Sequence, residues 1–257
     1  IVKSMSDTGR MVATEKTGVG SHFIANYPPF SLWTHEAVDT DAKPALAHRP
    51  ADVPLGLYLH IPFCRKRCHF CYYRVYTDRN ASEVAEYLDL LGREWELYAT
   101  QPAVAGRPLR FVYFGGGTPS FLSVRQLQGL IDRLSRVTTW TDAEEITFEC
   151  EPGTLTEPKL AAIREMGITR LSLGLEHFDD LVLELNGRAH RSAEIFRAYT
   201  FAQSLDFPQV NIDLIAGMLG DTDDKWRAAV DQTIELSPDS VTIYQMELPF
   251  NTTISSD

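Results

Sequence analysis

Short apolar runs alternate with stretches of helical periodicity along most of the chain. From Leu55 onward, six of these runs are short, apolar and bounded by turn residues, and they predict strands. The predicted strands cover residues 57–61, 109–114, 146–150, 170–175, 210–215 and 240–246. Runs that are apolar almost throughout suit a parallel sheet, because helices bury both of its faces.

Helices are predicted between these strands. The first begins after Asn80, and Glu83 three residues later completes the signature of a capping box. Its apolar residues recur at steps of four and three, which places them on one helix face. They are Val84, Leu88, Leu91, Trp95 and Tyr98. Further helices are predicted at 124–134, at 158–166 before Gly167, near 181, at 193–204 and around 226–234.

This alternation predicts an α/β fold with six βα-type units. Six units are fewer than the eight of a closed barrel, so an open, partial (β/α)6 TIM barrel or a doubly wound sheet is expected. Both architectures bind ligands at the carboxyl ends of their strands. Residues 1–54 contain scattered Gly, Pro, Ser and Thr, and they predict an irregular N-terminal arm before a core domain at 55–257.

Charge and composition narrow the class of protein. The chain has 257 residues and a formal net charge of −11, which argues against nucleic acid or an anionic membrane as its main partner. No apolar run is long enough to cross a bilayer. Three of the four cysteines lie within eight residues, which favours a reducing compartment, so we expect a cytoplasmic protein.

Those three cysteines are the strongest chemical signal. Cys64, Cys68 and Cys71 form a CxxxCxxC run directly after the first predicted strand. Three thiolates at this spacing fit one iron–sulfur cluster, and because such clusters usually take four cysteines, one iron would be open to a ligand. Cys150 lies far away in a predicted buried strand. A zinc site completed by His69 or His60 is the alternative that spacing alone leaves open.

Other polar residues follow the ends of neighbouring strands. The loop Gly115-Gly116-Gly117-Thr118 follows the second strand, and its glycines allow a close approach of backbone to a ligand. Carboxylates at strand ends can accept hydrogen bonds from ribose hydroxyls, and an arginine can clamp a carboxylate. The candidates are Glu149, Glu176, Asp213 and Arg188, although Arg188 could equally pair with Asp213. Together this set suits S-adenosylmethionine.

On these motifs the chain resembles the radical S-adenosylmethionine superfamily. It is most similar to the oxygen-independent coproporphyrinogen III oxidase branch, which includes relatives that methylate or cyclopropanate natural products. The resemblance runs from about Tyr27, and more clearly from Leu55, to the end. Its motifs are Tyr58-Leu59-His60-Ile61-Pro62-Phe63-Cys64, the cysteine run, Gly115 to Ser120, Glu149, Arg170 to Gly174, Gly187-Arg188 and Asn211 to Ile215.

The resemblance implies a partial (β/α)6 barrel and a [4Fe–4S] cluster on Cys64, Cys68 and Cys71. The reduced cluster would cleave S-adenosylmethionine to methionine and a 5′-deoxyadenosyl radical, and a second S-adenosylmethionine can bind. Roles carry over by position. Tyr58 is expected to be catalytic and to lie with Phe70 beside the cofactor, Gly115 to Thr118 at its methionine end, Glu149, Glu176 and Asp213 at the ribose, and Arg188 at the carboxylate.

Three departures from the oxidase pattern bear on the reaction. The oxidases carry Cys-Gly-Cys-Asn-Lys where this chain has Cys71-Tyr72-Tyr73-Arg74-Val75, and they usually carry Gln in place of Glu176. Their C-terminal substrate-covering domain does not appear within the 257 residues, so we expect either that it lies beyond them or that the pocket is closed differently. These departures lead us to expect C-methylation or cyclopropanation of an unsaturated small molecule.

Alternative functions remain. One is oxidative decarboxylation of coproporphyrinogen III, with Arg65, Lys66, Arg67, Arg74 and Arg79 as candidate contacts for its carboxylates. Another is a haem carrier or chaperone. For either enzyme we expect a small-molecule substrate and an electron donor such as flavodoxin or ferredoxin.

Overall fold

The computed structural model describes residues 3–5, 11–13, 34–247 and 252–256, and the chain divides into two compact units, 1–48 and 49–257. In the first unit, strands β1 (Lys3–Met5) and β2 (Met11–Ala13) pair antiparallel. Helix α1 (His35–Ala37), a π-helical turn (Val38–Ala42) and α2 (Lys43–Ala47) form a continuous helical stretch, which the scattered Gly and Pro do not predict. Residues 1–2, 6–10 and 14–33 of the predicted arm lie outside the described residues.

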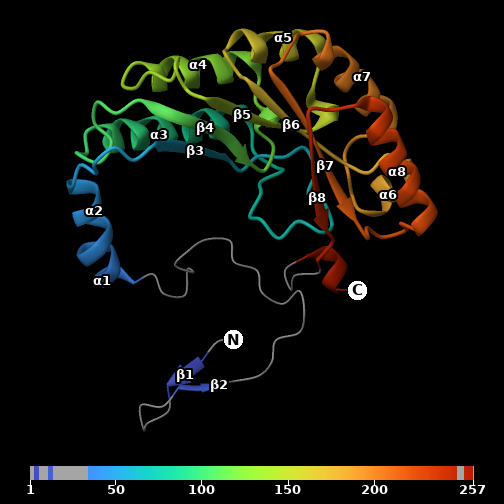
Figure 1. Cartoon of the computed structure of the whole chain (residues 1–257), viewed down its shortest axis with the longest axis horizontal. Coiled ribbons are helices and arrows are strands. Elements are labelled where there is room, and N and C mark those ends of the chain that lie inside the picture. The colour runs from blue at the N-terminus through green and yellow to red at the C-terminus, as the bar shows by residue number, and fades with distance from the viewer. Residues whose placement is uncertain (1–2, 6–10, 14–33, 248–251, 257) are drawn as a thin grey trace. The chain divides into compact units, whose positions relative to one another are not determined.

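The second unit is built on one parallel sheet of six strands, β3 to β8, whose order in the sheet is their order in the sequence (Figure 1). This confirms the predicted α/β fold and its open, partial (β/α)6 form. The strands are β3 (Leu55–Ile61), β4 (Leu109–Gly116), β5 (Glu145–Cys150), β6 (Arg170–Glu176), β7 (Gln209–Ala216) and β8 (Ser240–Gln245).

Helices connect these strands along the outer side of the curved sheet (Figure 1). Asn80 caps the first of them and forms the predicted capping box with Glu83. Ser123 forms a capping box with Gln126 at the start of the next. The helices are α3 (Ala81–Ala99), α4 (Val124–Ser135), α5 (Glu157–Glu165), α6 (Asp180–Leu185), α7 (Ser192–Gln203) and α8 (Asp223–Leu236), with short 3-10 turns at Pro119–Phe121, Pro152–Thr154 and Thr253–Ser256.

The two faces of the sheet differ in chemistry. Side chains alternate between the faces of a strand. One set is apolar and fully buried in the core, including Val112, Phe114 and Phe148. The other set is polar: Tyr113 on β4 and Glu149 on β5 share a hydrogen bond. The strands are therefore less continuously apolar than their composition predicts, and the polar face provides the surface on which a site can form.

Parallel pairing brings the carboxyl ends of all six strands to one edge. His60 pairs in register with Gly115, and Gly174 on β6 pairs with Asp213 on β7. The cysteine loop, the glycine loop and the segment after β5 all leave the sheet at this edge. Among the described residues, no helix combines the length and the hydropathy needed to cross a membrane.

Candidate functional site

The three clustered cysteines lie on the loop that follows β3. Cys64 is buried, Cys68 and Cys71 are partly exposed, and all three are free thiols. The Cys64 backbone N–H donates to the carbonyl of Tyr76 at 3.0 Å, which closes the loop onto its own C-terminal end. Burial raises the pKa of the Cys64 thiol to about 11 and also raises that of Cys71. Metal binding must therefore displace protons from these thiols.

Two donors from distant parts of the chain face the cysteine sulfurs. The hydroxyl of Thr118 lies 3.4 Å from Cys64 Sγ, and Arg188 Nη1 lies 3.1 Å from Cys68 Sγ. The Thr118 hydrogen bond and the charge of Arg188 both lower the pKa of the Cys64 thiol, against the larger effect of burial. The structure thus brings two residues predicted from the sequence, Thr118 and Arg188, to the cysteine loop.

The two histidines of the zinc alternative have other polar contacts. Within the described residues, no group of three or more Cys, His, Asp or Glu side chains, the three cysteines included, is placed to hold a metal ion, so this arrangement does not by itself distinguish zinc from a cluster. His69 Nδ1 lies 2.9 Å from the last carbonyl of α6, and His60 Nδ1 lies 3.1 Å from the Tyr58 hydroxyl. Cys150 is part of the hydrophobic core, as its position in a predicted buried strand suggests.

The glycine loop passes directly against the cysteine loop. A Cβ on Gly117 would lie 2.9 Å from Cys64 Sγ, and a Cβ on Gly115 would lie 3.1 Å from Oε1 of Glu149. Gly116 has a φ of +118°, a conformation that residues with side chains rarely adopt. This close approach explains why three consecutive glycines stand at the carboxyl end of β4.

Glu149 is held by groups from the neighbouring strand. Its carboxylate accepts hydrogen bonds from the Tyr113 hydroxyl at 2.7 Å and from the Gly116 N–H at 3.1 Å, and burial raises its pKa. Tyr58 stacks on Tyr113 with ring centroids 5.8 Å apart. Burial and the nearby Glu149 raise the pKa of Tyr58 to about 12, so this hydroxyl keeps its proton at neutral pH.

Asp213 lies on the same polar face, on β7. Its carboxylate accepts hydrogen bonds from Ser172 Oγ at 2.7 Å and from Asn211 Nδ2 at 3.0 Å. Burial raises its pKa. The pairing with Arg188 that the sequence leaves open is wrong, because Arg188 makes its polar contacts with the cysteine loop and β6 instead.

Arg188 is 8% exposed, and its guanidinium makes three polar contacts. Nη1 contacts Cys68, whereas Nη2 donates to the carbonyl of Gly174 at 2.7 Å and lies 3.6 Å from the carboxylate of Glu176. Burial raises the pKa of Glu176 to about 7. Arg188 Nε is buried and has no partner among the described residues. An unsatisfied buried donor of this kind is suited to an anionic ligand.

Phe70 lies between the second and third cysteines and is half-buried. It packs against a small apolar cluster of Val182, Ile215 and Met218, from α6 and the end of β7. This contact packs the cysteine loop, which follows β3, against α6 and the end of β7. Its expected position beside a cofactor stays a prediction, as do the ligand roles of the other site residues.

Sequence reasoning missed two members of this arrangement, Tyr113 and the site role of His60. Tyr113 positions Glu149, and His60 contacts the Tyr58 hydroxyl. The signal was available, because Tyr58 and His60 are two residues apart on one strand and must share a face. The partner of Tyr113 follows from strand register, which composition does not supply.

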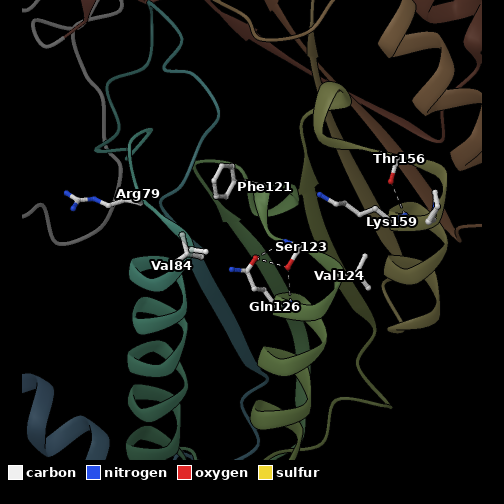
Figure 2. A pocket seen from close by; sticks show the side chains of 10 residues that line it. Arg79, Val84, Phe121, Ser123, Val124, Gln126, Thr156 and Lys159 are labelled. Atoms are coloured by element: carbon white, nitrogen blue, oxygen red, sulfur yellow. Dashed lines mark hydrogen bonds between the residues drawn. The ribbon is translucent and has the colours of Figure 1, made fainter.

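A pocket of about 470 Å³ lies elsewhere, at the N-terminal ends of α3, α4 and α5 (Figure 2). Its lining includes Arg79, Phe121 and Lys159, and none of the site residues predicted from the sequence. Ser123 and Thr156 cap the starts of α4 and α5 (Figure 2). The pocket is distinct from the site at the cysteine loop, because none of its lining residues belongs to that site.

A partial (β/α)6 barrel with three cysteines after its first strand and a polar interior face defines the class of this protein. The model of the radical SAM superfamily matches residues 58–233, and the chain belongs to this superfamily. Members use a [4Fe–4S] cluster and S-adenosylmethionine, which are therefore its cofactors.

Curated relatives include members of two groups. The oxygen-independent coproporphyrinogen III oxidase of Escherichia coli is 33% identical over 219 residues, which cover 85% of this chain and 47% of the relative. The haem chaperone HemW of Bacillus subtilis is 33% identical over 190 residues, covering 74% and 49%. The chain thus spans about half the length of the curated relatives it matches. These relatives do not support the expected methylation or cyclopropanation; they favour the alternatives.

Solved structures agree with this placement. The Escherichia coli coproporphyrinogen III oxidase, HemN, is similar with a TM-score of 0.82 and 30% identity over 91% of this chain and 54% of that one. The methyltransferase TsrM from Kitasatospora setae has a TM-score of 0.55 at 15% identity, covering 82% of this chain and 42% of its own. The second likeness concerns the fold alone.

The residues present fit the two cofactors. Three thiols without a fourth suit a cluster with one open iron. The unpartnered Nε of Arg188 is a donor for the carboxylate of an amino acid moiety, and Gly115 to Gly117 bring the backbone close to the cysteine loop. Glu149 on β5 and Asp213 on β7 provide acceptors on the polar face of the sheet.

Proposed function

We propose that this chain is the core of an enzyme that cleaves S-adenosylmethionine to form a 5′-deoxyadenosyl radical. When bound and reduced, the cluster supplies the electron that breaks the carbon–sulfur bond. The observation that carries the proposal is the contact between Arg188 and Cys68, since it places a carboxylate-binding side chain directly against a cluster ligand. The second S-adenosylmethionine stays a prediction.

The roles proposed for the other residues follow from their contacts. Gly116 and Gly117 provide the backbone surface for the methionine end. Glu149 and Asp213 accept from the ribose hydroxyls, and their raised pKa values reflect the burial that a ligand would complete. Tyr58 is 56% exposed and stacks beside this position, where a protonated hydroxyl can contact the cofactor.

For the substrate, the best-supported proposal is oxidative decarboxylation of a coproporphyrinogen-type molecule. The oxidase relative at 33% identity and its structure at a TM-score of 0.82 support it. The adenosyl radical would take a hydrogen atom from the carbon β to a carboxyl group. Loss of carbon dioxide and one electron to an external acceptor would then leave a carbon–carbon double bond. Flavodoxin or ferredoxin is proposed as the electron donor, and the cytoplasm as the location.

Not all the basic residues near the cysteines are available to meet substrate carboxylates. Arg65 is paired with Glu151, and Arg79 is paired with Glu83. Lys66 and Arg74 are exposed, and the Arg74 guanidinium lies 5.7 Å from the ring centre of Tyr76. Lys66 and Arg74 are therefore the better candidates for substrate contacts.

A second candidate function is haem binding as a chaperone. The haem chaperones among the relatives, at 33% identity over 190 residues, favour it. Such a protein would bind haem in a stoichiometric complex and release no decarboxylated product. The two proposals share the cluster and differ in what binds at the open edge.

One anaerobic experiment tests both. The protein is reconstituted with iron and sulfide, reduced with dithionite and incubated with S-adenosylmethionine, with and without coproporphyrinogen III. The enzyme proposal predicts 5′-deoxyadenosine in mass spectra, formed faster with the substrate. With an added one-electron acceptor, it also predicts products that have lost carbon dioxide and two hydrogen atoms, once or twice. A reconstituted protein that makes no 5′-deoxyadenosine but binds haem one to one would replace it with the chaperone.

The matched control for this experiment is the Cys68→Ala variant, treated identically. It should produce no 5′-deoxyadenosine, because two thiolates would remain for the cluster. If the wild-type reaction produced S-adenosylhomocysteine together with 5′-deoxyadenosine, the result would instead favour methyl transfer, which the relatives do not support.

A further inference from the structure

A single buried carboxylate joins two segments of the site, the cysteine loop and the segment that contains Arg188. Glu151 follows β5 directly, and its side chain is 10% exposed. The carboxylate receives hydrogen bonds from Arg65 Nε at 3.2 Å and Nη2 at 3.1 Å, from His190 Nδ1 at 3.0 Å and from the Gly153 N–H at 3.1 Å. The arginine contact is bidentate, which is the strongest and most directional form of this pair.

The two side-chain partners of Glu151, Arg65 and His190, each belong to one of these segments. Arg65 is adjacent to Cys64 in the cysteine loop, and its Nη2 also donates to the carbonyl of Ala189 at 3.1 Å. His190 lies two residues after Arg188, and its Nε2 is 3.2 Å from the carbonyl of Leu175 on β6. The cysteine loop and the Arg188 segment are separated by more than 100 residues and are held by the same carboxylate.

The surrounding backbone is shaped to this contact. A Cβ on Gly153 would lie 2.1 Å from Arg65 Nη2, so a larger residue there would displace the guanidinium. The Glu151 N–H donates to Ser120 Oγ at 3.0 Å, which anchors the segment to the loop after β4. Burial opposes ionisation of Glu151, but the hydrogen bond from His190 and the charges of Arg188 and Arg65 outweigh it and hold the pKa at about 2.

We propose that Glu151 is a positioning residue that holds the cysteine loop, through Arg65, and the Arg188 segment, through His190, in the geometry that binds the cluster and S-adenosylmethionine. This inference rests on the proposed function. In the described part of the chain, Glu151 hydrogen-bonds to none of the three cysteines and to none of the residues predicted to bind the cofactor, and it is not among the site residues predicted from the sequence. Arg65 becomes a structural member of the loop rather than a contact for the substrate.

A salt bridge that only stabilised the fold would behave differently. Arg133 makes a comparable bidentate pair with Glu96, with Nε to Oε1 at 2.6 Å and Nη2 to Oε2 at 2.9 Å, between α4 and α3. This pair lies on the helical layer and touches no residue of the cysteine loop. Glu96→Gln is therefore the matched control for Glu151→Gln.

The test measures the cluster and not turnover. Reconstituted wild type, Glu151→Gln and Glu96→Gln are mixed anaerobically with an iron chelator, and the rate of iron loss is followed by absorbance. Outer residues that orient metal ligands contribute about 10- to 100-fold in metal affinity, so we expect iron loss at least about 10-fold faster in Glu151→Gln and unchanged in Glu96→Gln. The change that S-adenosylmethionine causes in the electron paramagnetic resonance spectrum should also weaken in Glu151→Gln alone.

A second variant keeps the test decisive if Glu151→Gln folds poorly. Arg65→Gln removes the same contact by changing its more exposed partner. The variant that carries both Glu151→Gln and Arg65→Gln should lose iron no faster than the faster of the two single variants, because both substitutions act through one contact. Iron loss and spectra equal to wild type in folded Glu151→Gln and Arg65→Gln would overturn the positioning role alone. A wild-type protein that binds no iron–sulfur cluster would instead overturn the proposed function and this role with it.

Discussion

Arg188 donates a hydrogen bond from Nη1 to the sulfur of Cys68 at 3.1 Å, although the two residues are 120 positions apart in the chain. The contact joins the segment after α6 to the cysteine loop after β3. It also leaves Nε of Arg188 buried and without a partner among the described residues. One guanidinium thus contacts a predicted cluster ligand and retains a donor for the carboxylate of a cofactor.

The first prediction concerns that guanidinium. Arg188→Lys keeps the positive charge but loses the planar fork that reaches both Cys68 and Gly174. A buried hydrogen bond to a charged group contributes about 1.5–3 kcal/mol, so affinity for S-adenosylmethionine should fall about 10- to 150-fold. Equilibrium dialysis with the cluster-loaded protein measures this. Arg227→Lys, which changes an exposed pairing with Asp224 on α8, is the control and should bind normally.

The second prediction separates the four cysteines. Cys64→Ala, Cys68→Ala and Cys71→Ala should each bind little iron after reconstitution, because two thiolates do not hold the cluster. Cys150→Ala should retain iron near four per chain and lose about 1 kcal/mol of stability, since it removes a small core side chain. Iron and sulfide analysis decides the assignment, and loss of iron from Cys150→Ala would show that the ligands are wrong.

The third prediction compares two glycines. In Gly117→Ala the new Cβ would lie 2.9 Å from Cys64 Sγ and 3.0 Å from the carbonyl of Phe63, so the cysteine loop must shift. Iron content after reconstitution should drop by at least about half. Gly129→Ala, on the exposed face of α4 with nothing within 4 Å, should keep its iron and gain about 0.5–1 kcal/mol of stability. Equal iron content in the two variants would contradict the close packing.

The fourth prediction concerns pH. Burial raises the pKa of Glu176 to about 7 from an ordinary 4.5. Below pH 4.5 both the folded and the unfolded chain hold this proton. As pH rises through 7, the unfolded chain ionises more readily, so the folded state loses stability, by at most about 3 kcal/mol. Glu176→Gln replaces this carboxyl group with an amide that does not ionise. In the cluster-free protein, its melting temperature should therefore rise relative to wild type between pH 5 and pH 8.

Calorimetry or circular dichroism at the two pH values measures this difference, since the other titrating groups are common to both proteins. Glu184→Gln changes an exposed carboxylate with 67% of its side chain accessible, and its melting temperature should follow wild type at both pH values. A constant difference between wild type and Glu176→Gln across the range would show that Glu176 does not titrate there.

Much of the fold could be predicted because its signals are local. The capping box of Asn80 and Glu83 and the spacing of the apolar residues in α3 are contained within one helix. The cysteine loop and the glycines of β4 are likewise short motifs, and their spacing indicates their chemistry. The helical stretch at 35–47 escaped prediction, because its short turns lack a continuous apolar face.

The partners of the site residues could not be predicted in this way. The sequence leaves the partner of Asp213 open, and the register of β7 against β6 decides that Ser172 binds it, whereas Asn211 lies two residues earlier on the same strand and shares its face. Tyr113 was an ordinary strand residue in the sequence, and the pairing of β4 with β5 placed it beside Glu149.

The sequence by itself determined the alternation of strands and helices, the cluster-type cysteine spacing and the superfamily to which these motifs belong. Only the tertiary structure decided that Arg188 contacts Cys68 and that Glu151 joins Arg65 to His190. The physical reason is one of range. Periodicity and turn chemistry act over a few residues, whereas parallel pairing brings strand ends that are far apart in the chain to one edge of the sheet, where buried polar groups find their partners.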